Sequence, residues 1–461
     1  MTNRATLGRV DRSRSVVEAL GDWSVGHGPL FRRLALALSR LVERGVLAEG
    51  ARLPSERALA AALSVSRGTA VAAYDLLVAD GVVERRQGSG TYAVGSAAVG
   101  LPAGREGSGL VARLVDASAG SQEVIDLSLS VLPDALGLPA ASVTTADLTS
   151  VAPDTGYSPW GLHGLRELIA ERLTGEGLES TADQVVVTSG AQQAISLAAS
   201  CWVRPGDRVV VDDPTYPGAL SAFTAAGATV VAAFEGHPGL VYAQPAVQSP
   251  TGSVMTRTAR EALARAVVEA GVPLVEDRSL TGLAWDRVPP PVAASIPDHP
   301  VAVVGSLSKL LWGGLRLGFV RAPEPVALRF ARVKATHDLG TSVVGQLLAE
   351  RLLRHPDIEV FLADRRRVLR SRYDALTDAL RVHLPDWTWE EPRGGLSVWV
   401  RLPRPIAASL AQVALRHGVA VATAEALSGG ADHPDRLRLS FAAPEADLRE
   451  GVRRLAEAAT A

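Results

Sequence analysis

The chain has 461 residues, of which 47% are hydrophobic and 21% charged, with a formal net charge of −2. This length exceeds one ordinary hydrophobic core, so we expect a soluble globular protein of two or more domains. The single cysteine, Cys201, excludes an intrachain disulfide and a cysteine-based metal site, and it suits the cytoplasm. We expect no metal. We also expect no signal peptide, because the N-terminal residues include no apolar segment of that type, and no membrane span, because no uncharged apolar run is long enough.

Charge and composition vary along the chain. Residues 1–93 hold 13 arginines and 9 acidic residues, whereas the remainder holds 34 basic and 40 acidic residues. This asymmetry makes the N-terminal region the candidate for an anionic partner. Composition predicts a first domain over residues 27–94, a linker rich in Gly, Ala and Ser over 95–123, and a second domain over 124–461.

The first domain is dense in short predicted elements. Apolar residues recur at helical spacing over residues 30–42, and Ser55 can cap a second helix over 56–63. After the short turn "SVS", a third helix is predicted over 67–80, and "GVVERRQGSGTYAV" predicts two short strands around a glycine turn. These elements in this order form a winged helix-turn-helix, in which the third helix directs its N-terminal residues at base edges.

The motifs "LPSER", "VSR" and "GSGT" resemble those of the GntR-type DNA-binding domain, over residues 28–94. The resemblance implies binding to double-stranded DNA. The alternative for any single arginine is a solvated helical face. One departure is Val71, where many members of that family carry an arginine. The candidate DNA-binding residues are Arg57, Ser66, Arg67, Thr69, Arg86, Gln87 and Ser89.

In the second domain, apolar runs such as "DRVVVDDP" and "VPLVEDR" alternate with amphipathic helical runs, which predicts a largely parallel α/β sheet. The chain has only two lysines, Lys309 and Lys334. Lysine, unlike arginine, can lose its proton and form a Schiff base with an aldehyde cofactor. The hydroxyls of Ser306 and Ser308, with the Arg316 guanidinium, could hold a phosphate. The alternative is an ordinary lysine at a strand end.

Other strand ends in this domain carry polar groups of the same kind. The backbone N–H groups of Gly190 and Ala191, at a predicted helix N-terminus, could bind an anion. Tyr216 stands in a proline-flanked loop, where its ring could stack on a flat heterocycle. Asp277 ends a buried strand, where a carboxylate can pair with a pyridinium nitrogen. Taken singly, Asp277 could merely cap a loop and Tyr216 could be core.

As an ordered set, these residues resemble the class-I aminotransferases of fold type I, which bind pyridoxal 5′-phosphate (PLP), from residue 125 to the end. The resemblance implies that Lys309 forms the Schiff base, Asp277 pairs with the pyridine nitrogen and Tyr216 stacks on the ring. It implies a phosphate site made of Gly190, Ala191, Ser306, Ser308 and Arg316.

The resemblance also implies two residues at the edges of the site. Tyr157 matches a tyrosine that reaches the phosphate in the neighbouring subunit, and Arg438 matches the arginine that binds the substrate carboxylate. A salt bridge within the last part of the chain is the alternative for Arg438. The family pattern has a tyrosine and an asparagine that bond the cofactor phenolate oxygen. Here the positions are Ser279 and Ser249, each able to donate one hydrogen bond, and Val247 replaces a histidine.

A GntR-type domain followed by an aminotransferase-like domain is the arrangement of MocR-type transcription regulators. The resemblance implies a winged helix-turn-helix, a linker and a PLP-binding domain with a mostly parallel sheet and a smaller C-terminal α+β subdomain. It implies a homodimer that binds repeated or inverted half-sites and senses PLP or a small-molecule amine. One alternative is an active aminotransferase with an accessory DNA-binding domain, against which Ser279 and Ser249 argue. Another is a regulator that binds no PLP, against which Lys309 argues.

Overall fold

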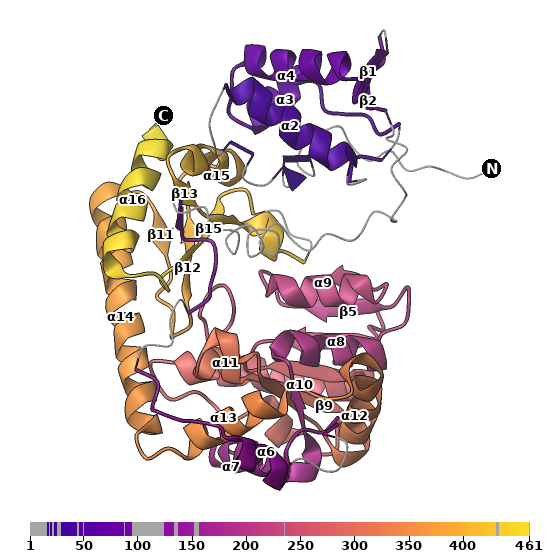
Figure 1. The fold of residues 1–461 in the computed structure, drawn as a ribbon, viewed down its shortest axis with the longest axis vertical. Helices are drawn as coiled ribbons and strands as arrows, with labels where there is room; N and C mark the ends of the chain where they lie inside the picture. Colours follow the sequence, from indigo (N-terminus) through magenta and orange to yellow (C-terminus); the bar gives the residue numbers. More distant parts are fainter. Residues whose placement is uncertain are drawn as a thin grey trace, which may run out of the picture.

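The computed structural model describes residues 16–94 and 124–460, except residues 18, 21–22, 25–28, 44–45, 49, 87, 133–136, 152–155, 235 and 430–432. The predicted linker over 95–123 therefore lies outside the described residues. Figure 1 shows a small N-terminal domain placed above a larger α/β body. Within the described ranges, no helix is both long and apolar enough to span a bilayer.

The N-terminal domain has the helix and hairpin order that the sequence predicts. Ser55 and Ser66 each begin a helix, because their hydroxyl groups accept the backbone N–H three residues later. Arg52 forms an isolated bridge to Tyr92, which adds the short strand before the second helix. The core of this domain also contains Val16, Val17, Leu20 and Trp23. The elements are α2 (Leu30–Glu43), α3 (Glu56–Ala62), α4 (Arg67–Ala79), β1 (Val83–Arg86) and β2 (Gly90–Ala93).

The body contains a seven-stranded sheet in the order β4-β10-β9-β8-β7-β5-β6. Strand β10 is antiparallel to both neighbours, and the other pairs are parallel. The central strands are buried runs rich in valine, as expected for a sheet covered on both faces. The mostly parallel sheet is confirmed. Its strands are β4 (Val185–Thr188), β5 (Arg208–Val211), β6 (Thr229–Val231), β7 (Leu240–Ala243), β8 (Leu274–Asp277), β9 (Val301–Ser306) and β10 (Gly318–Arg321).

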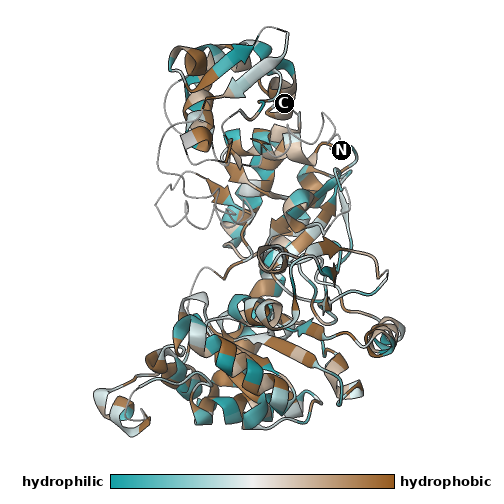
Figure 2. Cartoon of the chain, turned by 90° about the vertical axis from the view of Figure 1, so that its right-hand side faces the viewer, coloured by the Kyte–Doolittle hydropathy of each residue, from teal (hydrophilic) through white to brown (hydrophobic). Residues whose placement is uncertain are grey.

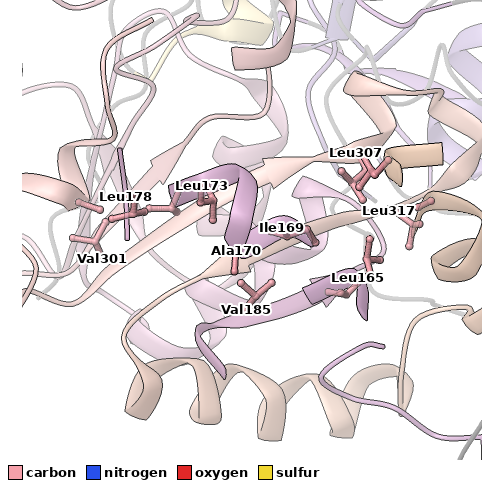
Figure 3. Packing of buried hydrophobic residues seen from close by; sticks show 14 of the residues in the cluster. Leu165, Ile169, Ala170, Leu173, Leu178, Val185, Val301, Leu307 and Leu317 are labelled. Atoms are coloured by element: carbon pink, nitrogen blue, oxygen red, sulfur yellow. The ribbon is translucent and has the colours of Figure 1, made fainter. Parts of the chain in front are cut away.

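Helices cover both faces of this sheet, and Figure 2 shows its strands as a hydrophobic layer beside helices of mixed hydropathy. Leu165, Ile169 and Leu173 recur every four residues on one face of a helix and pack in the same cluster as Val185, as Figure 3 shows. One face is covered by α7 (His163–Gly175), α10 (Arg257–Ala270) and α13 (Val343–Arg354), and the other by α8 (Ala191–Trp202), α9 (Pro217–Ala225) and α12 (Glu324–Asp338).

The C-terminal part of the body forms the smaller α+β subdomain that the sequence predicts. A four-stranded antiparallel sheet, in the order β11-β12-β15-β14, packs against three helices through a second apolar cluster. The chain enters the body at β3 (Ile125–Asp126), which pairs with β13 (Val419–Ala420). The other elements are α6 (Thr145–Val151), α11 (Leu307–Leu310), α14 (Ile358–His383), β11 (Thr388–Trp389), β12 (Ser397–Arg401), α15 (Ala407–Arg416), β14 (Ala422–Thr423), β15 (Arg436–Ser440) and α16 (Glu445–Thr460).

Candidate functional site

Three strand ends bring the predicted cofactor residues to one edge of the large sheet. Strand β9 leads directly into α11, which carries Lys309, and strand β8 ends at Asp277. Strand β4 is followed by Gly190, which begins α8 with a φ of +115° that favours glycine. Because β4, β8 and β9 run in the same direction, their carboxyl ends meet at one edge, where open α/β sheets bind ligands.

Lys309 supplies a half-buried amine at this edge. Its Nζ donates a hydrogen bond to the backbone oxygen of Ser130. Burial, followed by the positive charges of Arg438 and Arg316, lowers the pKa of Lys309 to about 8, while the charge of Asp277 acts in the opposite direction. An amine with this pKa is partly neutral near pH 8, and only the neutral amine is nucleophilic.

The rate at which PLP is taken up should therefore rise with pH around a midpoint near 8, well below the ordinary lysine value of 10.5. The sign follows because a lowered pKa makes the neutral amine available at lower pH. Stopped-flow absorption after mixing with PLP at different pH values measures this midpoint. In Arg438→Gln the midpoint should move upward, since one of the charges that lower the pKa is gone. A wild-type midpoint near 10.5 would contradict the lowered pKa of Lys309.

Asp277 is a buried carboxylate with three hydrogen-bond donors. Its Oδ2 accepts from the Tyr242 hydroxyl at 2.6 Å and from Gln244 Nε2 at 3.3 Å, and its Oδ1 accepts from the Ser279 backbone N–H at 2.8 Å. Burial, and next the charge of Asp277, raise the pKa of Tyr242, so its hydroxyl remains a donor. These donors hold the carboxylate in one orientation at the end of β8.

Tyr216 lies at the start of α9, where Gly218 leaves room for its ring. A Cβ on Gly218 would lie 2.5 Å from Cε1 of Tyr216 and 2.1 Å from Oε1 of Gln192. Burial, followed by the charge of Asp277, raises the pKa of Tyr216, while Arg316 and Arg438 lower it. The structure therefore brings this ring into the same electrostatic environment as Asp277 and the two arginines.

Arg316 places a cation over the N-terminus of α8. Its Nη2 donates to the Ser189 backbone oxygen at 3.0 Å and would lie 3.2 Å from a Cβ on Gly190. Arg316 itself has a φ of +50°, a strained conformation for a residue other than glycine. The guanidinium is exposed beside the backbone N–H groups of Gly190 and Ala191, a combination suited to a phosphate.

The two predicted serine contacts to phosphate differ in the structure. The Ser306 hydroxyl accepts the Lys309 backbone N–H at 3.2 Å, so its own proton stays available for a ligand. The Ser308 hydroxyl donates to the Leu317 oxygen at 3.1 Å and accepts from the Leu317 N–H at 2.9 Å. Ser308 is thus engaged in fixing the loop after α11, and Ser306 is the better phosphate donor.

Arg438 is a buried cation on β15, and its side chain is only 4% exposed. Its Nη2 donates to the Ser128 backbone oxygen, and its Nε has no hydrogen-bond partner among the described residues. Burial lowers the pKa of Arg438 to about 10. The alternative of a salt bridge is not seen in the described part of the chain, so the guanidinium is disposed to receive a carboxylate.

The remaining predicted contacts are divided between the buried site and the surface. The Ser279 hydroxyl is buried and has no partner in the described ranges, which leaves it available as a donor. Ser249 is buried, and its backbone N–H donates to Gln244 Oε1 at 3.2 Å. Tyr157 is 62% exposed and does not join the buried group. Val247 is buried as an ordinary apolar residue.

The predicted DNA-binding residues lie at the N-terminal ends of α3 and α4 and in the hairpin. Arg57, Arg67 and Ser66 are exposed, and the Ser66 hydroxyl lies 2.9 Å from that of Thr69. In the hairpin, the Arg86 guanidinium lies 4.5 Å from the Tyr92 ring centre and pairs with Glu84. Ser89 Oγ is 2.6 Å from the Tyr92 hydroxyl. Gln87 lies outside the described residues.

Comparison with known proteins agrees with this geometry. A model of the family described as aminotransferase class I and II matches residues 122–237 and 239–455, which is more than half of the chain. The chain belongs to the class I and II aminotransferase family. A model described as bacterial regulatory proteins, gntR family, matches residues 30–93. This aminotransferase family member therefore carries a GntR-type DNA-binding domain at its N-terminus, the organisation of MocR-type regulators.

Relatives of this family member include both regulators and enzymes. It is 28% identical to the uncharacterized HTH-type transcriptional regulator YisV of Bacillus subtilis, over 94% of this chain and 96% of that protein. It is 31% identical to the 2-aminoadipate transaminase of Thermus thermophilus, over 67% of this chain and 80% of that enzyme. The crystal structure of LysN, the alpha-aminoadipate aminotransferase of Thermus thermophilus complexed with N-(5′-phosphopyridoxyl)-L-leucine, is similar with a TM-score of 0.69 at 28% identity, over 79% of this chain and 97% of that chain.

The residues present fit the PLP that membership of the aminotransferase family implies. A half-buried amine, an oriented carboxylate and an exposed guanidinium beside a helix N-terminus match an aldehyde, a pyridinium nitrogen and a phosphate. The Ser279 hydroxyl and the Arg438 Nε are buried and have no hydrogen-bond partner among the described residues, and a bound cofactor and its ligand would satisfy them. PLP is therefore the cofactor of this domain.

Sequence reasoning missed the polar layer beneath this aminotransferase site. Tyr242 and Gln244 hold Asp277, and Gln244 N also donates to Asp212 Oδ2 at 2.8 Å. Burial raises the pKa of Asp212 to about 6. The signal was a polar pair, Tyr242 and Gln244, two residues apart in the strand run "LVYAQP". That spacing places both side chains on one face of the strand.

Proposed function

We propose that this protein is a cytoplasmic transcription regulator that senses PLP or an amino compound through its aminotransferase-like domain. The division into a DNA-binding domain over residues 27–94, a linker over 95–123 and an effector domain over 124–461 belongs to the proposal. The observation that carries it is the half-buried Lys309 amine at the sheet edge where Asp277 ends β8 and Gly190 precedes α8, in a chain that also carries a helix-turn-helix. A ligand at that site regulates DNA binding only if it prefers one conformation of the protein.

Each residue of the site has a defined role in this proposal. When bound, PLP supplies an electrophilic aldehyde carbon and an electron-withdrawing ring. Lys309 provides the amine that holds the aldehyde carbon, and Asp277 would face the ring nitrogen. Arg316, Ser306 and the N–H groups at the start of α8 would hold the phosphate. Tyr216 would cover the ring, and Arg438 would orient the carboxylate of an amino compound.

The dimer belongs to this proposal because one predicted site residue faces outward. Tyr157 is exposed, and so are Trp312, Leu339 and Val344. Trp312 follows Lys309 by three residues, so exposed apolar surface adjoins the edge of the large sheet that carries the predicted cofactor residues. Exposed apolar groups next to a site mark an interface. A second copy placed there would bring its Tyr157 to the phosphate and pair two DNA-binding domains for repeated or inverted half-sites.

A second candidate function is amino-acid transamination. It is favoured by Arg438, a buried guanidinium whose Nε has no partner in the part of the chain that the structure describes, which suits a substrate carboxylate. In this function, Lys309 would move the α-proton of the substrate as a general base. Ser279 and Ser249 provide shorter donors than the tyrosine and asparagine of the family pattern, which disfavours efficient turnover.

One experiment separates the two functions. An operator is first selected from a random duplex library by the full-length protein. Its affinity is then measured at fixed salt with no ligand, with PLP, and with PLP plus each amino acid of a panel, and keto-acid release is assayed in parallel. If the protein is a regulator, adding ligand changes the operator affinity of the wild-type protein but not that of Lys309→Ala. Release of keto acid is then negligible. Steady keto-acid release with unchanged operator affinity would instead identify an aminotransferase.

A further inference from the structure

Among the described residues, the DNA-binding domain contacts the body at α15, a helix of the C-terminal subdomain. Arg416, the last residue of α15, donates from Nη1 to the Leu63 oxygen and from Nη2 to the Ser64 oxygen, both at 2.8 Å. These two carbonyls lie where α3 ends and the turn toward α4 begins. Figure 1 shows α15 directly below the N-terminal domain, in agreement with its contacts to α3.

The chemistry of this contact explains why an arginine occupies position 416. The last carbonyls of a helix have no partners within the helix and carry the negative end of its dipole. A guanidinium presents parallel N–H groups, so it can satisfy two carbonyls at once. Burial lowers the pKa of Arg416, as expected for a cation withdrawn from water at a contact between domains. Arg416 therefore caps α3 from another domain.

A third hydrogen bond and a cavity complete the contact. Trp23 Nε1, in the core of the DNA-binding domain, donates to Gln412 Oε1 at 3.1 Å. Gln412 and Arg416 are four residues apart, so both lie on one face of α15. Beside them is a cavity of about 190 Å³, lined by Val17 and Ala62 of one domain and by residues at the start of α15. The contact consists of a few hydrogen bonds beside a cavity. The two domains can therefore separate at a small cost in free energy.

The same subdomain also contacts the ligand site. Helix α15 packs against β14, whose Ala422 pairs with Arg438 on β15. The Leu427 oxygen accepts from the Thr215 backbone N–H at 2.7 Å, next to Tyr216 in the chain. A carboxylate bound by Arg438, or a ring covered by Tyr216, would therefore act on the structure that holds Arg416.

We propose that α15 is the docking surface for the helix-turn-helix of the same chain. Arg416 is the positioning residue of this contact, which we call the dock. Through the dock, a ligand bound at Arg438 and Tyr216 changes the position of the turn before α4. This inference rests on the proposed regulatory function and specifies its route. The dock itself requires only the two hydrogen bonds of Arg416 to the end of α3.

Hydrogen–deuterium exchange of the full-length protein tests the dock first without ligand. The reporters are the Leu63, Ser64 and Val65 amides, which bond within the end of α3. Losing two charge-assisted hydrogen bonds at the turn in Arg416→Ala should speed their exchange about tenfold. Arg416→Lys keeps the charge but lacks the parallel N–H groups of the guanidinium. Its exchange rate should lie between those of Arg416→Ala and wild type. The control is Arg381→Ala, which removes an exposed arginine of α14 that pairs with Asp378. Equal exchange in all four proteins overturns the dock.

PLP is then added to the same proteins, and binding is followed by the visible absorption band. In wild type, the exchange at these amides should change when the band forms, whereas in Arg416→Ala the band should form without any further change. A band in wild type with unchanged exchange overturns the transmission through Arg416. Absence of the band in wild type contradicts the proposed function, and the comparison without PLP still decides the dock.

Discussion

Replacing Lys309 with alanine is expected to abolish the yellow absorption band that full-length protein forms with PLP. The band requires an amine that bonds to the aldehyde, and Lys309 supplies an amine of lowered pKa at the edge where β8 and β9 end. The expected effect is complete loss of the band at PLP concentrations that saturate wild type. Absorption spectra during a PLP titration of both proteins provide the measurement.

The chain offers a matched control, because Lys334 is its only other lysine. Lys334 is fully buried on α12, and its Nζ pairs with Asp338 Oδ1 at 2.8 Å. Lys334→Arg keeps this charge pair, so the band should persist in that variant. If the band survives in Lys309→Ala and is lost in Lys334→Arg, the assignment of the reactive amine is wrong.

Replacing Arg67 with alanine is expected to weaken operator binding by about 10- to 100-fold, the range for an arginine that reads a base edge. Arg67 is the first residue of α4 and is exposed, and the Ser66 cap fixes the start of this helix. A base contact confers sequence preference, so binding to unrelated duplex should change far less. Fluorescence anisotropy with the selected operator and a scrambled duplex, at fixed salt, measures both affinities.

Two further arginine variants sharpen this test. If Arg57 contacts a phosphate, Arg57→Ala should weaken binding to both duplexes by the same factor. It should also reduce the slope of log affinity against log salt concentration by about one. Arg40 is exposed on α2, outside the helix-turn-helix pair, so Arg40→Ala should leave operator affinity near that of wild type. Wild-type operator affinity in Arg67→Ala would show that α4 does not read the operator through this residue.

The sequence by itself determined the elements whose signals are local. The helices predicted over 56–63 and 67–80 are α3 and α4, because Ser55 and Ser66 cap through the N–H groups three residues ahead. The alternation of apolar and amphipathic runs likewise determined the mostly parallel sheet. Since parallel strands end at a common edge, the order of polar residues after those strands was enough to propose the cofactor site.

Tertiary structure alone decided the partners that lie far apart in the chain. Tyr242 reaches Asp277 because β7 and β8 are neighbours, and Arg416 binds the Leu63 carbonyl at the end of α3, 353 residues away. Such contacts depend on strand order and on domain placement. Short-range periodicity does not encode either of them, because residues on one face of a helix or strand can pack against many alternative neighbours. Burial then sets the charge state of Lys309, which the residue type alone leaves open.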